Sequence, residues 1–274
     1  ELTMAYEEIK LATENLSEWM EPIAEKTPLM AMPAKSYTLF EPMGVTLIIS
    51  PWNYPFLLAI DPLIGAMAAG NTIILKTSRK SKHTSSLIRE IINANFDPKY
   101  IHVVDNEQVS HDELLSYNYD HIFYTGGAEV GKKIMQAASK NLSKVTLELG
   151  GKSPAIVEGD ANIGLAARSI AWGNTVNAGQ TCVSPDYILV HVSIKDRFVR
   201  ELENALLEFY GPDPINCRDY ANIINKEHLE KLVGLLRGQN IIYGGEFDSN
   251  NLKLAPTIVD GVDSVSYTHL TLPT

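Results

Sequence analysis

One of the two cysteines of the chain, Cys182, lies in the stretch NAGQTCVSPD, among small, polar and turn-forming residues. A cysteine that fills a hydrophobic core normally has apolar neighbours. The thiolate is the nucleophilic form, so a reactive thiol needs surroundings that favour ionisation or offer a base. The stretch indicates a nucleophilic thiol exposed on a turn. The other cysteine, Cys217, has no motif around it and is interpreted as a structural or surface thiol.

The sequence SPWNYP at 50–55 follows an apolar run directly. The side-chain amide of Asn53 is a donor that can stabilise a developing oxyanion. The alternative is a plain turn, because proline and asparagine are common turn residues.

The sequence TGGAEVG at 125–131 lies between the apolar run HIFYT and the helical pattern VGKKIMQAASK. Glycines at such a turn allow close approach of the backbone, and the helix N-terminus offers N–H groups to a phosphate. The pattern is not the G-x-G-x-x-G dinucleotide fingerprint. A glycine-rich helix start without a ligand is the alternative.

Glu148 lies in the apolar run VTLELGG, just before a double glycine. A carboxyl group buried among leucines holds its proton more tightly and can act as a general base near neutral pH. The alternative is an acid on the solvated edge of a strand.

Strands and helices alternate through the first half of the chain, which predicts βαβ units and a parallel sheet. The expected strands are 45–50, 72–75, 101–104, 121–124 and 144–147, and the expected helical segments are 55–70, 84–95, 107–115 and 128–140. Such a sheet binds ligands at the carboxyl ends of its strands. The turn-forming cluster LGGKSP at 149–154 predicts a domain boundary. A second α/β unit follows, with strands expected at 155–157, 187–191, 241–243 and 255–259 and helices at 163–175, 194–210 and 226–237.

Composition fits a soluble globular protein, with 45% hydrophobic and 20% charged residues. The formal net charge of −10 disfavours bulk binding to nucleic acid or anionic membranes. Two cysteines cannot form a disulfide framework, which predicts a reducing, cytoplasmic environment. Neither a C-x-x-C nor an H-E-x-x-H spacing is present, so no metal site is expected. No signal peptide or membrane segment is expected either.

The motifs PWNYP, TGGAEVG, LELGGKSP and NAGQTCVSPDY occur in the order found in NAD(P)-dependent aldehyde dehydrogenases, and the chain resembles that family from about residue 2 to residue 263. The TGG and CVSPDY sequences look most like the class 3 branch. The resemblance implies a doubly wound parallel-sheet cofactor domain over 1–148, in which 34–42 supplies a strand to an oligomerisation sheet. It also implies a second, incomplete α/β catalytic domain over 149–263, followed by an atypical tail at 264–274.

The resemblance further implies oxidation of an aldehyde to a carboxylic acid. Cys182 would form the thiohemiacetal and thioacyl intermediates, Asn53 and the Cys182 N–H would stabilise the oxyanion, and Glu148 would activate the hydrolytic water. The residues expected to bind NAD or NADP are Ser50, Pro51, Trp52, Lys76, Arg79, Gly126, Gly127, Ala128, Glu129, Val130, Gly131 and Leu149. Arg79 stands where the family often has a glutamate on the adenosine ribose, so we expect NADP to be accepted.

The chain departs from the family at both ends. Family members are longer, and the ending SVSYTHLTLPT lacks the acid of the family's E-E-I-F-G-P motif that holds the nicotinamide ribose. One alternative is therefore a non-catalytic fragment that at most binds a dinucleotide. Another is a reductase of activated acyl groups, which Glu148 disfavours, because relatives that transfer the acyl group to coenzyme A generally lack this acid. The expected partners are an aldehyde substrate and, in the full-length protein, a second copy in a homodimer.

Overall fold

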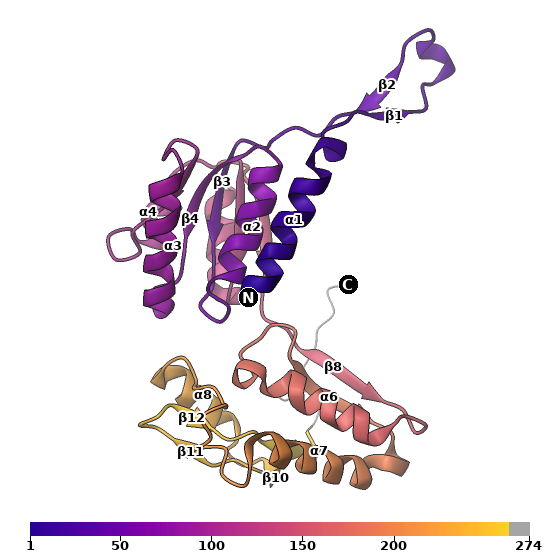
Figure 1. Ribbon diagram of the computed structural model, residues 1–274, viewed down its shortest axis with the longest axis vertical. Coiled ribbons are helices and arrows are strands. Elements are labelled where there is room, and N and C mark those ends of the chain that lie inside the picture. The colour runs from indigo at the N-terminus through magenta and orange to yellow at the C-terminus, as the bar shows by residue number, and fades with distance from the viewer. Residues whose placement is uncertain (263–274) are drawn as a thin grey trace. The chain divides into compact units, whose positions relative to one another are not determined.

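The computed structural model describes residues 1–262 and divides into two units, Glu1–Leu149 and a second that begins at Gly150 (Figure 1). The tail predicted at 264–274 lies outside the described residues, as does Asp263 at the end of the predicted catalytic domain. Within residues 1–262, no helix combines the length and apolar character that crossing a membrane requires.

The first unit is built on a five-stranded sheet in which every pair of neighbouring strands is parallel. Its strands are β3 (Val45–Ile49), β4 (Thr72–Lys76), β5 (Ile101–Val103), β6 (His121–Thr125) and β7 (Lys144–Glu148). The spatial order is β5-β4-β3-β6-β7. The chain therefore starts in the middle of the sheet, builds outward to β5, and then reverses direction across β3 to β6.

Helices cover both faces of this sheet, because successive side chains of a strand point to opposite faces. Leu47 and Ile49 pack in a core with residues of α4 (His111–Leu114) and α5 (Ala128–Ala138). Ile48 packs in a second core with residues of α2 (Leu57–Ala68) and α3 (Lys82–Asn95), which follows the short helix η2 (Arg79–Ser81). The predicted doubly wound α/β architecture is confirmed.

Two polar side chains tie together the amino ends of three neighbouring strands. The backbone N–H of Gly44 donates to Oδ1 of Asn71 at 3.0 Å, and Asn71 directly precedes β4. The backbone N–H of Val45, at the start of β3, donates to Oδ2 of Asp120 at 2.7 Å, and Asp120 directly precedes β6. The starts of β3, β4 and β6 are thereby held at fixed heights relative to one another.

The N-terminal part of the first unit consists of a helix and a projecting hairpin. Helix α1 (Leu2–Trp19) packs on α2. The antiparallel strands β1 (Ile23–Glu25) and β2 (Ser36–Thr38) form an arm beyond α1, with the short helix η1 (Leu29–Ala31) between them (Figure 1). Of the segment 34–42, predicted as a strand, residues 36–38 are extended, and β1 is their partner within the chain.

The second unit has a parallel pair, β8 (Ser153–Val157) and β9 (Pro185–Val190), packed on two helices. These are α6 (Ile163–Thr175), which begins at the capping side chain of Asn162, and α7 (Lys195–Tyr210). The short helices η3 (Val176–Gly179) and η4 (Val192–Ile194) join these elements. The remaining elements are α8 (Lys226–Leu235) and two antiparallel pairs, β10 (Asn240–Tyr243) with β13 (Ile258–Asp260) and β11 (Phe247–Asp248) with β12 (Lys253–Leu254).

Most expected elements differ from the observed ones by one or two residues at an end, but two are much shorter, and each of these has a physical reason. The segment 107–115 is helical only in α4. Asn106 and Val109, which precede α4, accept hydrogen bonds from the side chain of Lys76 at the end of β4 and are not part of a helix. The strand expected at 255–259 begins at Ile258. Pro256 has no N–H to donate to a neighbouring strand, so the ladder does not extend back to residue 255.

Candidate functional site

The carboxyl ends of β3, β4 and β6 lie side by side, and candidate residues stand directly after them. Ile49 is paired with Lys76 on one side and with Tyr124 on the other. Ser50, Thr77 and Thr125 therefore end their strands at nearly the same height. The strand order reverses between β3 and β6, and ligands of doubly wound sheets bind outside the carboxyl ends at such a reversal.

Ser50 has a polar group that the described part of the chain does not satisfy. Its side chain is 4% exposed, and its hydroxyl has no hydrogen-bond partner within residues 1–262. Its backbone N–H is bonded to the Lys76 carbonyl at 2.9 Å. A buried polar atom without a partner costs about 1–3 kcal/mol. A ligand hydroxyl or phosphate oxygen at this edge would relieve that cost.

The start of α5 is a glycine turn. A Cβ at Gly126 would lie 2.3 Å from the Tyr124 hydroxyl, so only glycine fits there, whereas a Cβ at Gly127 would have no atom within 4 Å. Gly127 is the N-cap of α5, and within the described residues no side chain caps this end. Glu129 in the first turn bonds Lys132 at 2.8 Å, and that bond lowers the pKa of the Glu129 carboxyl. Within the described residues, the N-terminus of α5 therefore has no side-chain acceptor, and a helix N-terminus of this kind can bind a phosphate.

Lys76 is buried at the end of β4, with 1% of its surface exposed. Its Nζ bonds Oδ1 of Asn106 and the carbonyl of Val109, both at 3.3 Å. Burial, followed by the positive charge of Arg79, lowers the pKa of the Lys76 ammonium, and Asp105 opposes this shift. Arg79 donates to the carbonyls of Asn106 and Val109. Both cations are thus held against the segment that follows β5.

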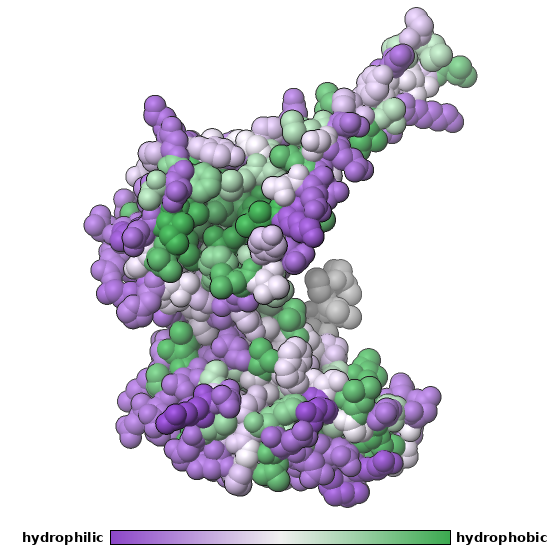
Figure 2. Space-filling view, viewed as in Figure 1, coloured by the Kyte–Doolittle hydropathy of each residue, from purple (hydrophilic) through white to green (hydrophobic). Residues whose placement is uncertain are grey.

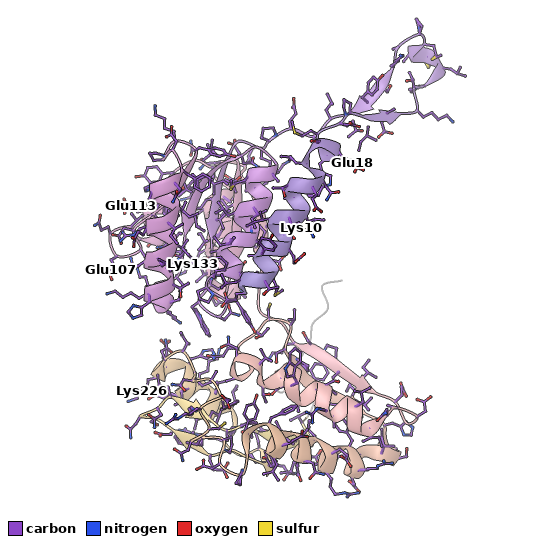
Figure 3. All side chains as sticks on the ribbon, in the orientation of Figure 1. Lys10, Glu18, Glu107, Glu113, Lys133 and Lys226 are labelled. Carbon is purple, nitrogen blue, oxygen red and sulfur yellow. The ribbon has the colours of Figure 1, made fainter. Side chains whose placement is uncertain are left out.

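A polar hollow of about 240 Å³ opens beside Arg79 within the first unit. It is lined by Ser78, Arg79, Lys82, Ser85, Ser86, Arg89, Val104, Asp105, Asn106 and Glu107. Arg89 is paired with Asp105, and Lys82 with Glu107 at 3.1 Å (Glu107 is labelled at the margin of the unit in Figure 3). Three cations face two carboxylates here, which leaves a small excess of positive charge.

The other predicted residues of the first unit lie along the same edge. Pro51, Trp52 and Asn53 are half-buried. The Lys80 ammonium lies 5.7 Å from the centre of the Trp52 ring, so the segment after β3 adjoins η2. Leu149 is half-buried near Gly131, where an added Cβ would lie 3.1 Å from the leucine side chain.

Glu148 is the last residue of β7, at the edge of the sheet, and its side chain is exposed. The expectation of a carboxyl buried among leucines is wrong, because within residues 1–262 β7 has a neighbouring strand on one side only. Its backbone carbonyl accepts a hydrogen bond from the Gly126 N–H at 2.9 Å. Glu148 is therefore anchored to the turn that starts α5.

Cys182 lies in the second unit on a turn between η3 and β9, and it is exposed. Three consecutive residues before it, Asn177, Ala178 and Gly179, have φ values of 54°, 53° and 73°. Left-handed conformations are unfavourable for residues other than glycine, so the surrounding structure must hold this turn.

Gly151 packs directly against the Cys182 backbone. A Cβ at Gly151 would lie 2.1 Å from the Cys182 carbonyl oxygen, whereas a Cβ at the neighbouring Gly150 would have no atom within 4 Å. Next to this contact, Lys152 pairs with Asp186 at 3.1 Å. The double glycine and the cysteine turn, which are about 30 residues apart, thus form one local structure within the second unit.

Replacing Gly151 by alanine is expected to destabilise the second unit by about 1–3 kcal/mol, because a backbone oxygen must move to admit the methyl group. Gly150→Ala is the matched control, with an expected change within about 0.5 kcal/mol. Urea unfolding of both variants measures the difference. Equal stabilities would contradict the close packing of Gly151 on Cys182.

These features fit a dinucleotide, with the unpartnered Ser50 hydroxyl and the uncapped start of α5 on the same sheet edge. Residues 1–262 contain no cluster of three or more His, Cys, Asp or Glu side chains that could hold a metal ion.

The family model described as "Aldehyde dehydrogenase family" matches residues 1–269. The chain belongs to the aldehyde dehydrogenase family. It is 45% identical over 268 residues to the dimeric NADP-preferring aldehyde dehydrogenase of Canis lupus familiaris, covering 97% of this chain and 59% of that protein. It is 42% identical over 256 residues to aldehyde dehydrogenase family 3 member A2 of Pongo abelii, covering 93% and 53%.

A solved structure, the substrate-bound state of Staphylococcus aureus AldH, superposes with a TM-score of 0.90 at 44% identity, covering 98% of this chain and 59% of that one. The predicted resemblance to the class 3 branch is confirmed. The chain spans less than two thirds of the length of these relatives.

Asn106 is a residue of the same edge that the sequence analysis does not identify. Its side chain bonds Lys76 and also Oγ1 of Thr77, at 2.8 Å, and its carbonyl accepts from Arg79. The sequence contains a signal for it, because Asn106 closely follows the expected strand 101–104, as Gly126 follows the expected strand 121–124.

Proposed function

We propose that the protein oxidises an aldehyde to a carboxylic acid with NAD or NADP, through covalent intermediates on Cys182. The observation that supports this most directly is the exposed thiol of Cys182 on a turn packed against Gly151, in a chain of the aldehyde dehydrogenase family. A structural cysteine would not need three consecutive left-handed residues before it.

In the proposed reaction, the Cys182 thiolate attacks the aldehyde carbon and forms a C–S bond, which converts the carbonyl to a thiohemiacetal oxyanion. The side-chain amide of Asn53 and the backbone N–H of Cys182 donate hydrogen bonds to that oxygen. Loss of hydride from the same carbon leaves a thioester. Glu148 takes a proton from water as the water attacks the thioester, so the acid is released and the thiolate is regenerated.

Glu148 supports hydrolysis over transfer of the acyl group to coenzyme A. Its exposure at the end of β7 gives water direct access to the carboxylate. Formation of an acyl-coenzyme A without free acid would contradict this, and consumption of acyl-coenzyme A with reduced cofactor would favour the reductase alternative.

The bound dinucleotide would supply hydride acceptance, and residues of the first unit would hold it. We assign Ser50 and Lys76 to hydroxyl groups of the ligand, and the start of α5 at 126–131 to its phosphates. Pro51, Trp52 and Leu149 would supply apolar surface.

We assign Arg79 to the 2′-phosphate that distinguishes NADP from NAD. Its guanidinium has five donors, of which the Asn106 and Val109 carbonyls use two, and it lines the hollow with Lys82 and Arg89. Since a charge-assisted bond contributes about 1.5–3 kcal/mol, Arg79→Ala is expected to raise the KM for NADP about tenfold or more. The KM for NAD should change little.

Initial rates at varied NADP and varied NAD measure this effect, with Arg197→Ala, an exposed arginine of the second unit, as the control. Equal changes for both cofactors in the Arg79 variant would refute the assignment.

The activity itself is tested by the absorbance of reduced nicotinamide, with the purified chain, a medium-chain aldehyde, and NAD or NADP in separate runs. Formation of carboxylic acid in equal amount to the reduced cofactor supports the proposal. A folded chain without turnover would favour the alternative that it only binds a dinucleotide.

We also propose that the protein is a cytoplasmic homodimer whose hairpin arm takes part in the dimer interface. Figure 2 shows apolar side chains along this arm, where Leu29 is 91% and Met32 60% exposed. Exposed apolar groups in such density are typical of an interface. Sedimentation at micromolar concentration tests this, and a monomer would contradict it.

A further inference from the structure

The side chain of Gln180 bridges the Cys182 turn to a distant segment of the second unit. Its Nε2 donates to the Asn177 carbonyl at 2.9 Å and to the Asn222 carbonyl at 3.0 Å. Its Oε1 accepts from the backbone N–H of Ile224 at 2.9 Å. One side-chain amide thus joins two segments that are more than 40 residues apart in the sequence.

The far end of this bridge is firmly held. Ile223 is 3% exposed, and its N–H donates to the Leu252 carbonyl at 2.7 Å. Asn225 caps α8 by accepting from the His228 N–H at 2.9 Å. The buried side chain of Ile223 therefore lies between the two residues that Gln180 contacts, and a capped helix follows them.

The near end of the bridge is the strained part of the turn. Asn177, whose carbonyl accepts from Gln180, is the first of the three left-handed residues. Gln180 itself is two positions before Cys182. The bonds to Asn222 and Ile224 therefore oppose relaxation of this turn before Cys182, whereas Gly151 packs against Cys182 itself.

We propose that Gln180 is a positioning residue, which fixes the orientation of the Cys182 thiol by tying its turn to residues 222–224. This inference rests on the proposed role of Cys182 as the nucleophile. Without the bridge, the turn relaxes, and the thiol stays exposed but loses its fixed direction. A reaction that depends on orientation then slows, whereas one that depends only on access does not.

Two reagents separate these effects, and peptide mass spectrometry assigns each product to Cys182. With p-nitrophenyl acetate, the thiolate attacks the ester carbonyl, p-nitrophenolate leaves, and a thioester forms. This acyl transfer depends on orientation of the thiol and on stabilisation of an oxyanion. Iodoacetamide alkylates by displacement of iodide and needs only an accessible thiolate.

Gln180→Ala is expected to acylate Cys182 at least about tenfold more slowly, with an unchanged or faster alkylation. Gln180→Glu matches glutamine in size and keeps the acceptor for Ile224, but it cannot donate to the two carbonyls, so it should also acylate slowly. Gln239→Ala, an exposed glutamine of the same unit, is the control and should behave as the wild type. Wild-type acylation in either Gln180 variant, or equal losses with both reagents, overturns the proposal.

Thermal unfolding shows whether each variant folds, and if Gln180→Ala does not unfold cooperatively, Gln180→Glu decides. Hydrogen exchange at the Ile224 amide measures the bridge without any chemistry at Cys182, and exchange at least about tenfold faster in Gln180→Ala is expected. An unchanged rate overturns the bridge. If the wild type is alkylated but not acylated at Cys182, the proposed function fails. The rate of hydrogen exchange at the Ile224 amide then still tests whether Gln180 holds the turn to residues 222–224.

Discussion

Replacement of Cys182 by alanine is expected to abolish aldehyde-dependent reduction of NAD or NADP, with a loss of at least about 10³-fold. The methyl group cannot form a bond to the aldehyde carbon, so neither the thiohemiacetal nor the thioester exists. Because Cys182 is exposed, the substitution removes little packing, and the free energy of unfolding should hardly change. Absorbance of reduced nicotinamide and thermal unfolding, measured on the same preparation, test both statements.

Cys217→Ala is the control, since this half-buried thiol has no proposed part in the reaction. Its variant should oxidise aldehydes at a rate close to that of the wild type. Residual turnover of the Cys182 variant above a few per cent would contradict covalent catalysis at this residue. If only the Cys217 variant lost activity, Cys217 and not Cys182 would be the nucleophile.

Glu148→Gln is expected to lower steady-state turnover by about 10²–10⁴-fold, the usual contribution of a general base. The two steps before hydrolysis do not use this carboxylate in the proposed reaction. Each molecule should therefore release about one equivalent of reduced cofactor rapidly and then stall as the thioester. Stopped-flow absorbance measures the burst, and mass spectrometry of the Cys182 peptide should show the added acyl group.

Glu18→Gln, at an exposed position of α1, is the matched control and should show neither the burst nor the loss (Glu18 is labelled in Figure 3). A slow Glu148 variant that accumulates no acyl group would place the carboxylate in an earlier step. Wild-type turnover in that variant would remove Glu148 from the reaction.

The sheet of the first unit could be predicted because its strands are short apolar runs, such as 45–49, separated by segments of helical length. The ends of the strands then identify the candidate edge without any contact information, since parallel strands share one carboxyl edge. For the same reason, Ser50, Lys76 and Gly126 could be assigned to one edge from the sequence.

What the sequence does not reveal is pairing between distant segments. Whether Glu148 is buried depends on which strands flank β7, and an apolar run looks the same at the edge of a sheet as in its centre. Two of the partners of Gln180 are 42 and 44 residues away, and all three of its bonds go to backbone groups, which exist at every residue. Pattern alone does not single out such contacts.

The polar bonds at the amino ends of β3, β4 and β6 have a consequence for errors during folding. Leu47, Ile48 and Ile49 are all buried, so a strand shifted by one or two residues would still present apolar side chains to both layers. A two-residue shift would nevertheless displace Ser50 by about 6.6 Å relative to Thr125. Asn71 and Asp120 disfavour such a shift. Their side-chain oxygens accept from the N–H groups of Gly44 and Val45 in one register only, so a shifted strand would lose both hydrogen bonds. The bond from Val45 to Asp120 joins positions 75 residues apart, so the register of β3 against β6 is fixed only after most of the unit has folded.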